Sequence, residues 1–224
     1  MACIKHNAYY FENIPYTIAS DLQASLSTDI TSGNSLGTFL FAQHPPVITL
    51  GRNALKSHIL SAEDTLASSG ISLAQADRGG GLTYHGPGQI LLYPILRIRG
   101  LYSVVSYVES LQTVVARTLT SFGLAPHFKN GNPGVWVGDG KISSIGIRIR
   151  EGITSHGLSL NVFGDLTGFD HITACNDPTL RHTSIEHESN VPVGCDTVVQ
   201  ELSRNVEIVF QTQLVWQDTQ NYVT

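Results

Sequence analysis

A glycine-rich stretch at residues 77–94 carries the densest set of chemically useful groups in the chain. It places Arg78, Thr83, His85 and Gln89 among five glycines, and an apolar run follows. Because glycine has no Cβ, the backbone N–H groups of such a loop can come within hydrogen-bonding distance of a ligand. The spacing matches neither a dinucleotide fingerprint nor a P-loop. The stretch predicts a ligand-binding loop at a sheet edge, with a plain turn as the simpler alternative.

Cys175 lies in an irregular segment and is the candidate nucleophile. The thiolate is the reactive form, and a free thiol has a pKa of about 8.5, so this interpretation requires an activating neighbour. Candidate neighbours are His85, His156, His171 and Lys141. An ammonium held in apolar surroundings beside a thiol can stabilise the thiolate, or lose its proton and act as a base. The alternatives are a small buried hydrophobe for Cys175 and a solvated strand-edge residue for Lys141.

The composition favours one α/β domain over residues 1–224. The chain has 224 residues, of which 42% are apolar and 14% are charged, enough for one well-buried core. The net charge of -5 argues against nucleic acid as the main partner. No apolar run approaches the roughly 20 residues that span a bilayer. We therefore expect neither nucleic acid nor a membrane among the partners.

The three cysteines, Cys3, Cys175 and Cys195, are sparse and form no C-x-x-C pair. Such a count fits a reducing compartment, where one thiol can be reactive. The first residues contain neither a secretory apolar region nor an Arg-rich amphipathic leader. We therefore expect a cytoplasmic protein, with Cys195 packed near a helix start and Cys3 in a loosely held terminus.

Apolar residues at helical spacing predict four helices that flank and support these segments. They are expected over residues 14–31, 61–69 and 103–122, and after position 196. The expected N-caps are Asn13 for the first, Ser61 for the second and Asp196 for the last. The predicted buried faces contain Ile18, Leu22, Leu26 and Ile30 in the first helix, Val104, Val105, Val108, Leu111, Val115, Leu119 and Phe122 in the third, and Val198, Leu202, Val206 and Val209 in the last.

Strands are predicted where apolar residues run or alternate between glycine, proline and asparagine breakers. They are expected at residues 37–43, 47–51, 71–76, 89–98, 145–150 and 153–162, with a hairpin around Gly138-Asp139-Gly140. The strand at 145–150 is expected to be half exposed, and residues 163–194 are expected to be irregular.

Three blocks of the sequence together resemble the octanoyltransferase family of lipoate synthesis. The first is Asp77-Arg-Gly-Gly-Gly-Leu-Thr-Tyr-His-Gly-Pro-Gly-Gln. The second comprises Gly134-Val-Trp-Val, Lys141-Ile-Ser-Ser-Ile-Gly-Ile-Arg-Ile and His156-Gly-Leu-Ser-Leu-Asn-Val. The third is Phe169-Asp-His-Ile-Thr-Ala-Cys, with Thr183-Ser184 at the family's spacing. The resemblance covers almost the whole chain and implies an α/β fold, with mixed sheets flanked by helices, like that of biotin and lipoate protein ligases.

The resemblance also implies the site. In the family a cysteine is acylated and a lysine tunes it, and these residues match Cys175 and Lys141. The substrate-binding segments of the family fall on Arg78, Gly79, Gly80, Gly81, Leu82, Thr83, Tyr84, His85, Ser144, Ile145, Gly146, Gly157, Leu158 and Ser159. We expect His85 to line the site instead of acting as a base. The alternative for both His85 and His156 is that each only hydrogen-bonds the loop in which it sits.

The implied reaction moves an octanoyl group from octanoyl-acyl carrier protein to a lysine of a lipoyl domain. The implied acceptors are lipoyl domains of 2-oxoacid dehydrogenase complexes or the glycine cleavage H protein. A donor that is already a thioester needs no ATP, metal or other cofactor. We expect a monomer. Arg148 and Arg150 are candidates for docking an acidic carrier protein, although exposed strand arginines commonly face water.

Two residues next to Cys175 depart from the family pattern. The family has proline and glycine where this chain has Ala174 and Asn176. If the glycine position requires a positive φ, asparagine is among the least strained replacements. Loss of the proline frees one φ and should loosen the loop.

Three other functions fit parts of the pattern. An ATP-dependent lipoate or biotin protein ligase would share the fold but would need no cysteine nucleophile. A catalytically weak scaffold that binds acyl-proteins would tolerate the changes around Cys175, and a thioesterase would release free octanoate. Arg78 is expected to hold its loop through Asp77 or another acidic partner, with an exposed surface pair as the alternative.

Overall fold

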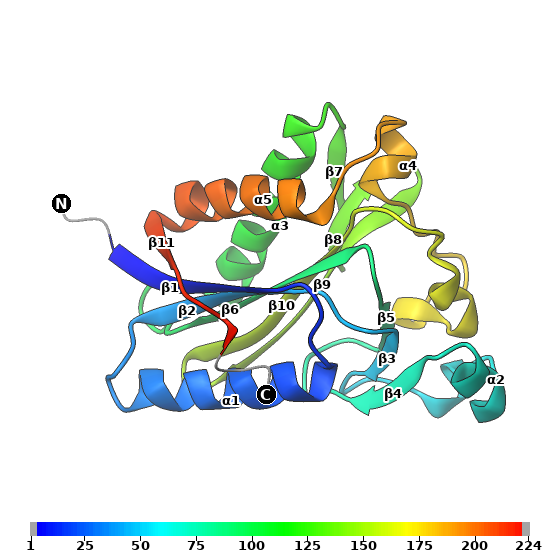
Figure 1. Ribbon diagram of the computed structural model, residues 1–224, viewed down its shortest axis with the longest axis horizontal. Helices are drawn as coiled ribbons and strands as arrows, with labels where there is room; N and C mark the ends of the chain where they lie inside the picture. The colour runs from blue at the N-terminus through cyan, green and yellow to red at the C-terminus, as the bar shows by residue number, and fades with distance from the viewer. Residues whose placement is uncertain (1–3, 221–224) are drawn as a thin grey trace.

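The computed structural model describes residues 4–220, in which eight strands form a large mixed sheet (Figure 1). In spatial order they are β11 (Thr212–Trp216), β1 (Ile4–Phe11), β2 (Gly37–Ala42), β6 (Gln89–Leu96), β10 (Ile153–Asn161), β9 (Gly140–Arg150), β8 (Asn132–Val137) and β7 (Pro126–Lys129). β1 pairs in parallel with β11 and β2, and the remaining pairs are antiparallel. The predicted hairpin around Gly138 is confirmed as β8 and β9.

A smaller sheet stands beside one end of the large one (Figure 1). It contains β4 (Ser72–Gln75), β3 (Val47–Leu50) and β5 (Leu82–His85), so the glycine-rich stretch does lie at a sheet edge. Around it lie η1 (Lys56–His58), α2 (Glu63–Ser68), η2 (Thr167–His171) and η3 (Ala174–Asn176). An apolar cluster that includes Ile48, Leu82, Phe169 and Ala174 joins this sheet to the η2–η3 segment.

Helices cover both faces of the large sheet (Figure 1). α1 (Tyr16–Thr31) packs on one face, while α3 (Val104–Ser121) and α5 (Cys195–Phe210) pack on the other; α4 (Ile185–Ser189) is a short helix ahead of α5. Each face has its own apolar cluster. Because β6 lies between these layers, all of its residues are buried, as expected from its unbroken apolar run.

The predicted caps are wrong for three helices. α1 begins after Pro15, which makes no side-chain cap, so Asn13 lies outside it. α2 begins after Ala62, one residue beyond Ser61. α5 begins after Gly194, which places Asp196 inside the first turn, where its charge still complements the helix dipole. Charge and capping favour the same residue types within one turn, so the sequence could not separate the two roles.

The predicted buried faces are wrong at their ends. Ile18 is 45% exposed, because steps of four residues overrun the 3.6-residue period of a helix and drift off the core face. Val104 and Val105 are exposed in the first turn of α3, whereas Tyr107, Val114 and Thr118 are buried. The strands β1, β5, β7 and β11 were not predicted from the sequence, because they are short or depend on distant pairing.

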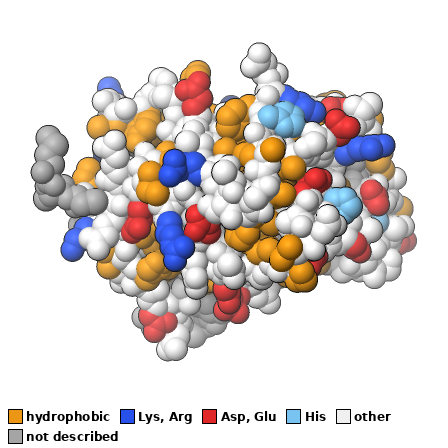
Figure 2. Space-filling view, turned by 90° about the horizontal axis from the view of Figure 1, so that it is seen from above, with side chains coloured by type: hydrophobic (Ala, Val, Ile, Leu, Met, Phe, Trp, Pro, Cys, Tyr) orange, Lys and Arg blue, Asp and Glu red, His pale blue; other side chains and the backbone are white. Residues whose placement is uncertain are grey.

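The surface mixes charge signs. Figure 2 shows Lys and Arg side chains interspersed with Asp and Glu on the face seen from above in Figure 1, with a band of apolar side chains between them. This face therefore lacks the single-sign basic patch that is typical of nucleic-acid binding. Within residues 4–220, no helix has the length and apolar character needed to cross a membrane.

Candidate active site

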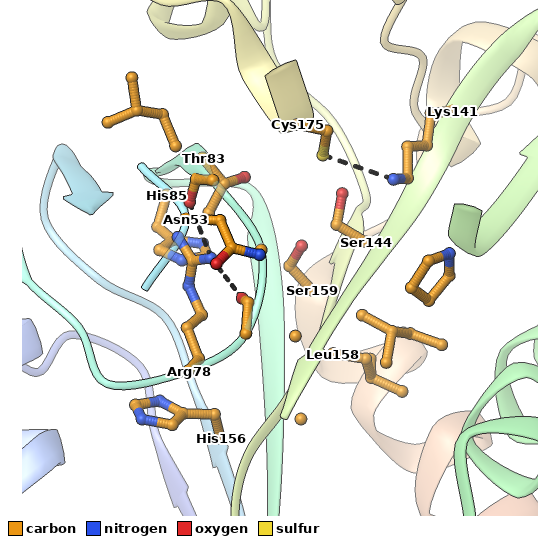
Figure 3. Close-up of a pocket in the computed structure, with 18 of the residues that line it drawn as sticks. Asn53, Arg78, Thr83, His85, Lys141, Ser144, His156, Leu158, Ser159 and Cys175 are labelled. Carbon is orange, nitrogen blue, oxygen red and sulfur yellow. Dashed lines mark hydrogen bonds between the residues drawn. The ribbon is translucent and has the colours of Figure 1, made fainter. Parts of the chain in front are cut away.

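A cavity of about 320 Å³ opens between the glycine-rich loop, strands β9 and β10, and the turn that carries Cys175 (Figure 3). Its volume is at the lower end of the range for small-molecule sites. All the predicted substrate-binding residues line it except Tyr84. Side chains alternate along β5, so Thr83 and His85 face the cavity while the Tyr84 ring packs on Phe169, 5.5 Å between centroids.

Lys141 reaches Cys175 in this cavity. Its Nζ lies 3.5 Å from Cys175 Sγ and donates a hydrogen bond to Asn132 Oδ1 at 3.0 Å. Lys141 is only 1% exposed, so it is not a solvated edge residue, and its ammonium lies 5.0 Å from the centroid of the Trp136 ring. Its arm passes over Gly134, where a Cβ would lie 2.5 Å from Lys141 Cε. The Trp136 ring attracts the ammonium, and the absence of a Cβ at Gly134 leaves room for the Lys141 side chain beside the sulfur.

The Cys175 turn contains two consecutive residues in the left-handed region. Cys175 has φ 54° and Asn176 has φ 61°, so position 176 does require a positive φ, and asparagine tolerates it. The Asn176 side chain bonds the His58 ring at 3.0 Å and donates to the Asn53 carbonyl at 3.4 Å. These contacts tie the turn to the segment after β3 and offset part of the freedom gained without a proline.

Arg78 is buried, and its partners differ from the prediction. Its guanidinium donates to the carbonyls of Gly79, Gly81 and Thr49 and to Thr49 Oγ1, at 2.7–3.1 Å. Asp77 instead pairs with Arg148 and with His156, because adjacent side chains of an extended segment point to opposite sides. Burial lowers the pKa of Arg78, yet an arginine remains charged. Arg78 therefore brings a fixed positive charge to the cavity.

The histidines do not contact the sulfur. His85 bonds Gln89 Oε1 through Nδ1, and burial holds its pKa well below 6.5, so it lines the cavity as a neutral ring. His156 also lines the cavity, but its Nε2 is 2.6 Å from Asp77 Oδ1. His171 bonds Ser61 Oγ at 2.7 Å and does not line the cavity. Among the four candidate partners, Lys141 is the one that meets Cys175.

Cys195, the other cysteine among the described residues, does not line the cavity. Cys195 is buried at the start of α5, 3.3 Å from Gln43 Oε1, and burial raises the pKa of its thiol to about 12. This confirms its expected packing role. Cys3 lies outside the described residues.

Several cavity residues were missed by the sequence analysis. They are Tyr16 from α1, Asn53 after β3, Leu91 and Tyr93 from β6, and Gly131, Asn132 and Pro133 at the start of β8. The breaker run Gly131-Asn132-Pro133 marks a turn, but nothing local indicates that Asn132 faces Lys141. Leu91 and Tyr93 belong to a fully buried strand, whose pattern does not distinguish core from cavity.

Comparisons with known proteins identify the family of the chain. Residues 15–208 match the lipoyl protein ligase A/B catalytic domain. An octanoyltransferase of Koribacter versatilis is 35% identical, covering 93% of this chain and 86% of that protein. An octanoyltransferase of Chloroflexus aurantiacus is 39% identical, covering 90% of this chain and 92% of that protein.

Solved structures share the fold at low identity. A putative lipoate protein ligase from T. acidophilum has a TM-score of 0.73 and 17% identity, covering 97% of this chain and 90% of that one. A biotin protein ligase from Aquifex aeolicus in complex with biotin and ATP has a TM-score of 0.56 and 14% identity, covering 92% and 70%. At such identities the likeness establishes the fold alone.

The matched catalytic domain places the chain in the lipoyl protein ligase A/B class, with a mixed α/β architecture. Within that class, the chain belongs to the octanoyltransferase family. The predicted fold class and family are thereby confirmed.

Proposed function

We propose that this octanoyltransferase works through a thioester on Cys175, with Lys141 as its proton-transfer partner. The observation that carries the proposal is the 3.5 Å contact between Cys175 Sγ and Lys141 Nζ. An ammonium beside a thiol favours the thiolate, and the buried charge of Arg78 faces the same cavity. A cysteine packed as a hydrophobe would not need either cation.

In the first step, Cys175 Sγ attacks the carbonyl carbon of octanoyl-acyl carrier protein. The new carbon–sulfur bond forms, the bond to the carrier's sulfur breaks, and the carrier thiolate takes a proton from Lys141. The backbone N–H groups of the glycine-rich loop or of the Cys175 turn are the natural donors for the transient oxyanion. One such donor contributes about 3 kcal/mol in other acyl-transfer enzymes.

In the second step, the amine of a lipoyl-domain lysine attacks the Cys175 thioester. The amide bond forms, the Cys175 carbon–sulfur bond breaks, and the now neutral Lys141 takes a proton from the attacking nitrogen. The enzyme returns to its starting state, with Cys175 as thiolate and Lys141 charged. The cycle consumes no nucleotide, because the donor is already activated.

The octanoyl chain is proposed to lie along the apolar part of the cavity. Leu91, Ile145 and Leu158 line it together with glycines 79–81. Each buried methylene contributes about 0.8 kcal/mol, so the chain adds substantial binding with little need for polar contacts. The names of the octanoyltransferase relatives support this choice of acyl group.

Intact mass spectrometry tests the proposal. The protein is incubated with octanoyl-acyl carrier protein, without ATP, and weighed; we expect the mass of one octanoyl group. The gain should vanish in Cys175→Ser and persist in Cys195→Ser, a matched control at the other described cysteine. Adding a lipoyl domain should move the label to that domain.

Each alternative has its own outcome. Transfer of free octanoate that requires ATP would indicate a ligase. Binding of the carrier protein without any mass gain would indicate a scaffold. Octanoate released at full rate without an acceptor would indicate a thioesterase. Any of these results overturns the proposed transfer.

A further inference from the structure

A second cavity adjoins the far end of the active-site cavity. It has about 330 Å³, a volume close to that of the first, and it lies between α1 and the β9–β10 hairpin. His156 lines both cavities. Figure 3 shows Cys175 and Lys141 at one end of the labelled residues and His156 at the other, with Ser144, Ser159 and Leu158 between. The His156 ring is therefore a partition.

The second cavity is polar, unlike the slot beside Leu158. Most of its wall is polar or charged and includes Gln23, Ser27, Asp77, Arg148, Arg150 and Ser155. The Gln23 Nε2 is buried without a hydrogen-bond partner among the described residues. A roomy polar space of this kind holds water instead of hydrocarbon.

The partition is held from several elements at once. His156 has φ 56°, a conformation that a histidine inside a strand rarely adopts. Its ring bonds Asp77 at 2.6 Å and meets the Tyr93 ring edge-on, and its backbone N–H donates to Gln23 Oε1 at 2.7 Å. Burial, together with the charges of Arg78 and Arg148, lowers its pKa to about 4.

The strand register gives the depth of the slot. A Cβ on Gly134 would lie 3.3 Å from Lys141 Nζ, and Gly134 pairs with Ser144, so the reacting end lies level with Ser144. His156 pairs with Ile147, three residues further along β9. At about 3.3 Å per residue, the backbone of His156 lies roughly 10 Å along the sheet from the reacting end.

An octanoyl chain has a matching length. Staggered carbon–carbon bonds of about 1.5 Å advance roughly 1.25 Å each, so the seven bonds from carbonyl to methyl span about 9 Å. A chain with two or more extra carbons would run into the His156 ring. Beyond that ring it would enter a polar space that favours water.

We propose that His156 is the end wall of the acyl slot and sets the upper limit of acyl length. The inference rests on the proposed acyl-enzyme at Cys175. It assigns His156 a role in specificity and none in proton transfer. The bond to Asp77 positions the ring, and the positive φ turns it across the slot.

Competition between chain lengths tests the proposal. The enzyme is offered equal amounts of octanoyl-, decanoyl- and dodecanoyl-carrier protein, and the acyl-enzymes are resolved by intact mass. We expect His156→Gly to raise the dodecanoyl-to-octanoyl ratio by about tenfold or more, while octanoyl loading continues. A few methylenes in an apolar pocket discriminate to that degree. Glycine also relieves the positive φ.

Two further variants keep the test decisive. His156→Asn tolerates the same φ and shortens the side chain less than glycine does, so it should raise the ratio less. It provides the test if the glycine variant fails to fold. Ser155→Ala changes only the second cavity and should leave the ratio unchanged. An unchanged ratio in folded His156→Gly and His156→Asn, with octanoyl loading intact, overturns the end-wall proposal. Absence of loading in the parent protein instead overturns the proposed function.

Discussion

The two walls of the cavity hold their buried cations in opposite ways. In the glycine-loop wall, Arg78 makes four hydrogen bonds, all to backbone carbonyls or to Thr49. In the Cys175 wall, Lys141 bonds one side-chain amide, that of Asn132, and otherwise meets the sulfur and an indole face. The bonds of Arg78 thus tie its loop together, whereas Lys141, the proposed proton-transfer partner, makes few competing hydrogen bonds.

The two walls also differ in backbone strain. Cys175 and Asn176 both occupy the left-handed region, which costs an L-residue about 1–2 kcal/mol. The glycine loop instead uses Gly80 at its positive φ, where no Cβ resists. The glycine-loop wall is therefore the less strained of the two, and the strained wall holds the proposed nucleophile, Cys175.

The largest expected effect comes from removing the reactive cation. Lys141→Met keeps the arm's volume and should slow acyl loading by about 10²–10⁴-fold. Stability should be unchanged or higher, because a buried charge is replaced by an apolar group. Single-turnover loading and thermal unfolding measure the two quantities.

Lys129→Met is the matched control for this variant. Lys129 lies 5.2 Å from the centroid of the same Trp136 ring but is exposed and does not contact the sulfur. Its loading rate should stay within about twofold of the parent. Equal losses in both variants would assign the effect to the indole contact instead of the Cys175–Lys141 pair.

Removing the structural cation should chiefly lower stability. Arg78→Met leaves the buried acceptors of Thr49 and Gly81 unpaired, and we expect the free energy of unfolding to fall by about 3 kcal/mol. Urea denaturation measures it. Arg204→Met removes an exposed pair with Glu201 and should change it by less than about 1 kcal/mol. A loss as small as the control would refute the role of Arg78 as a tie.

Acid should lower the free energy of unfolding through buried histidines such as His44. Burial lowers the pKa of His44 to about 4 from 6.5, so between these values the unfolded chain takes up a proton that the folded one does not. Stability is therefore full above pH 6.5 and declines as the pH falls toward 4. His44→Gln should reduce the loss between pH 7 and pH 5 by about 2 kcal/mol. Urea denaturation at pH 7 and pH 5 measures the loss in each protein. Equal losses in the parent and in His44→Gln would contradict the prediction.

The smallest expected effect concerns the strained turn. Asn176→Ala should lower the free energy of unfolding by about 1 kcal/mol more than Asn176→Gly, because alanine tolerates φ 61° poorly. Both variants lose the contacts to His58 and Asn53, so the difference isolates the backbone. Chemical denaturation of the pair checks it. Equal stabilities would mean that the turn relaxes out of the left-handed region.

Local patterns predicted the frame of the molecule better than its site. The β8–β9 hairpin followed from Gly138-Asp139-Gly140, and the buried strand β6 followed from its apolar run. β1 and β11 were missed because each pairs with strands distant in sequence, and their own residues carry no clear alternation. Such pairing is decided by the assembled sheet, which no local window contains.

The meeting of Lys141 and Cys175 came from the family resemblance, because spacing alone left several partners open. The bonds of Arg78 to carbonyls were not predictable, since backbone acceptors have no signature in the sequence. The positive φ of His156 was equally hidden, because glycine and asparagine are the residues that normally announce it. All of these features depend on contacts between segments that are distant in the sequence.

The proposed reacting pair, Cys175 and Lys141, bridges the junction between the two sheets. η3 packs against β5 of the small sheet, while Lys141 belongs to β9 of the large one. Residues 172–182, which include Cys175, are held at each end by a β-bridge. One bridge joins Ile59 to Ile172, and the other joins Lys141 to His182. A slip of about 1 Å along this seam would part sulfur from nitrogen and slow turnover roughly a hundredfold. Under the proposed mechanism, turnover therefore depends on how well the packing between the two sheets is maintained. A mutation distant from the cavity can lower turnover by weakening that packing.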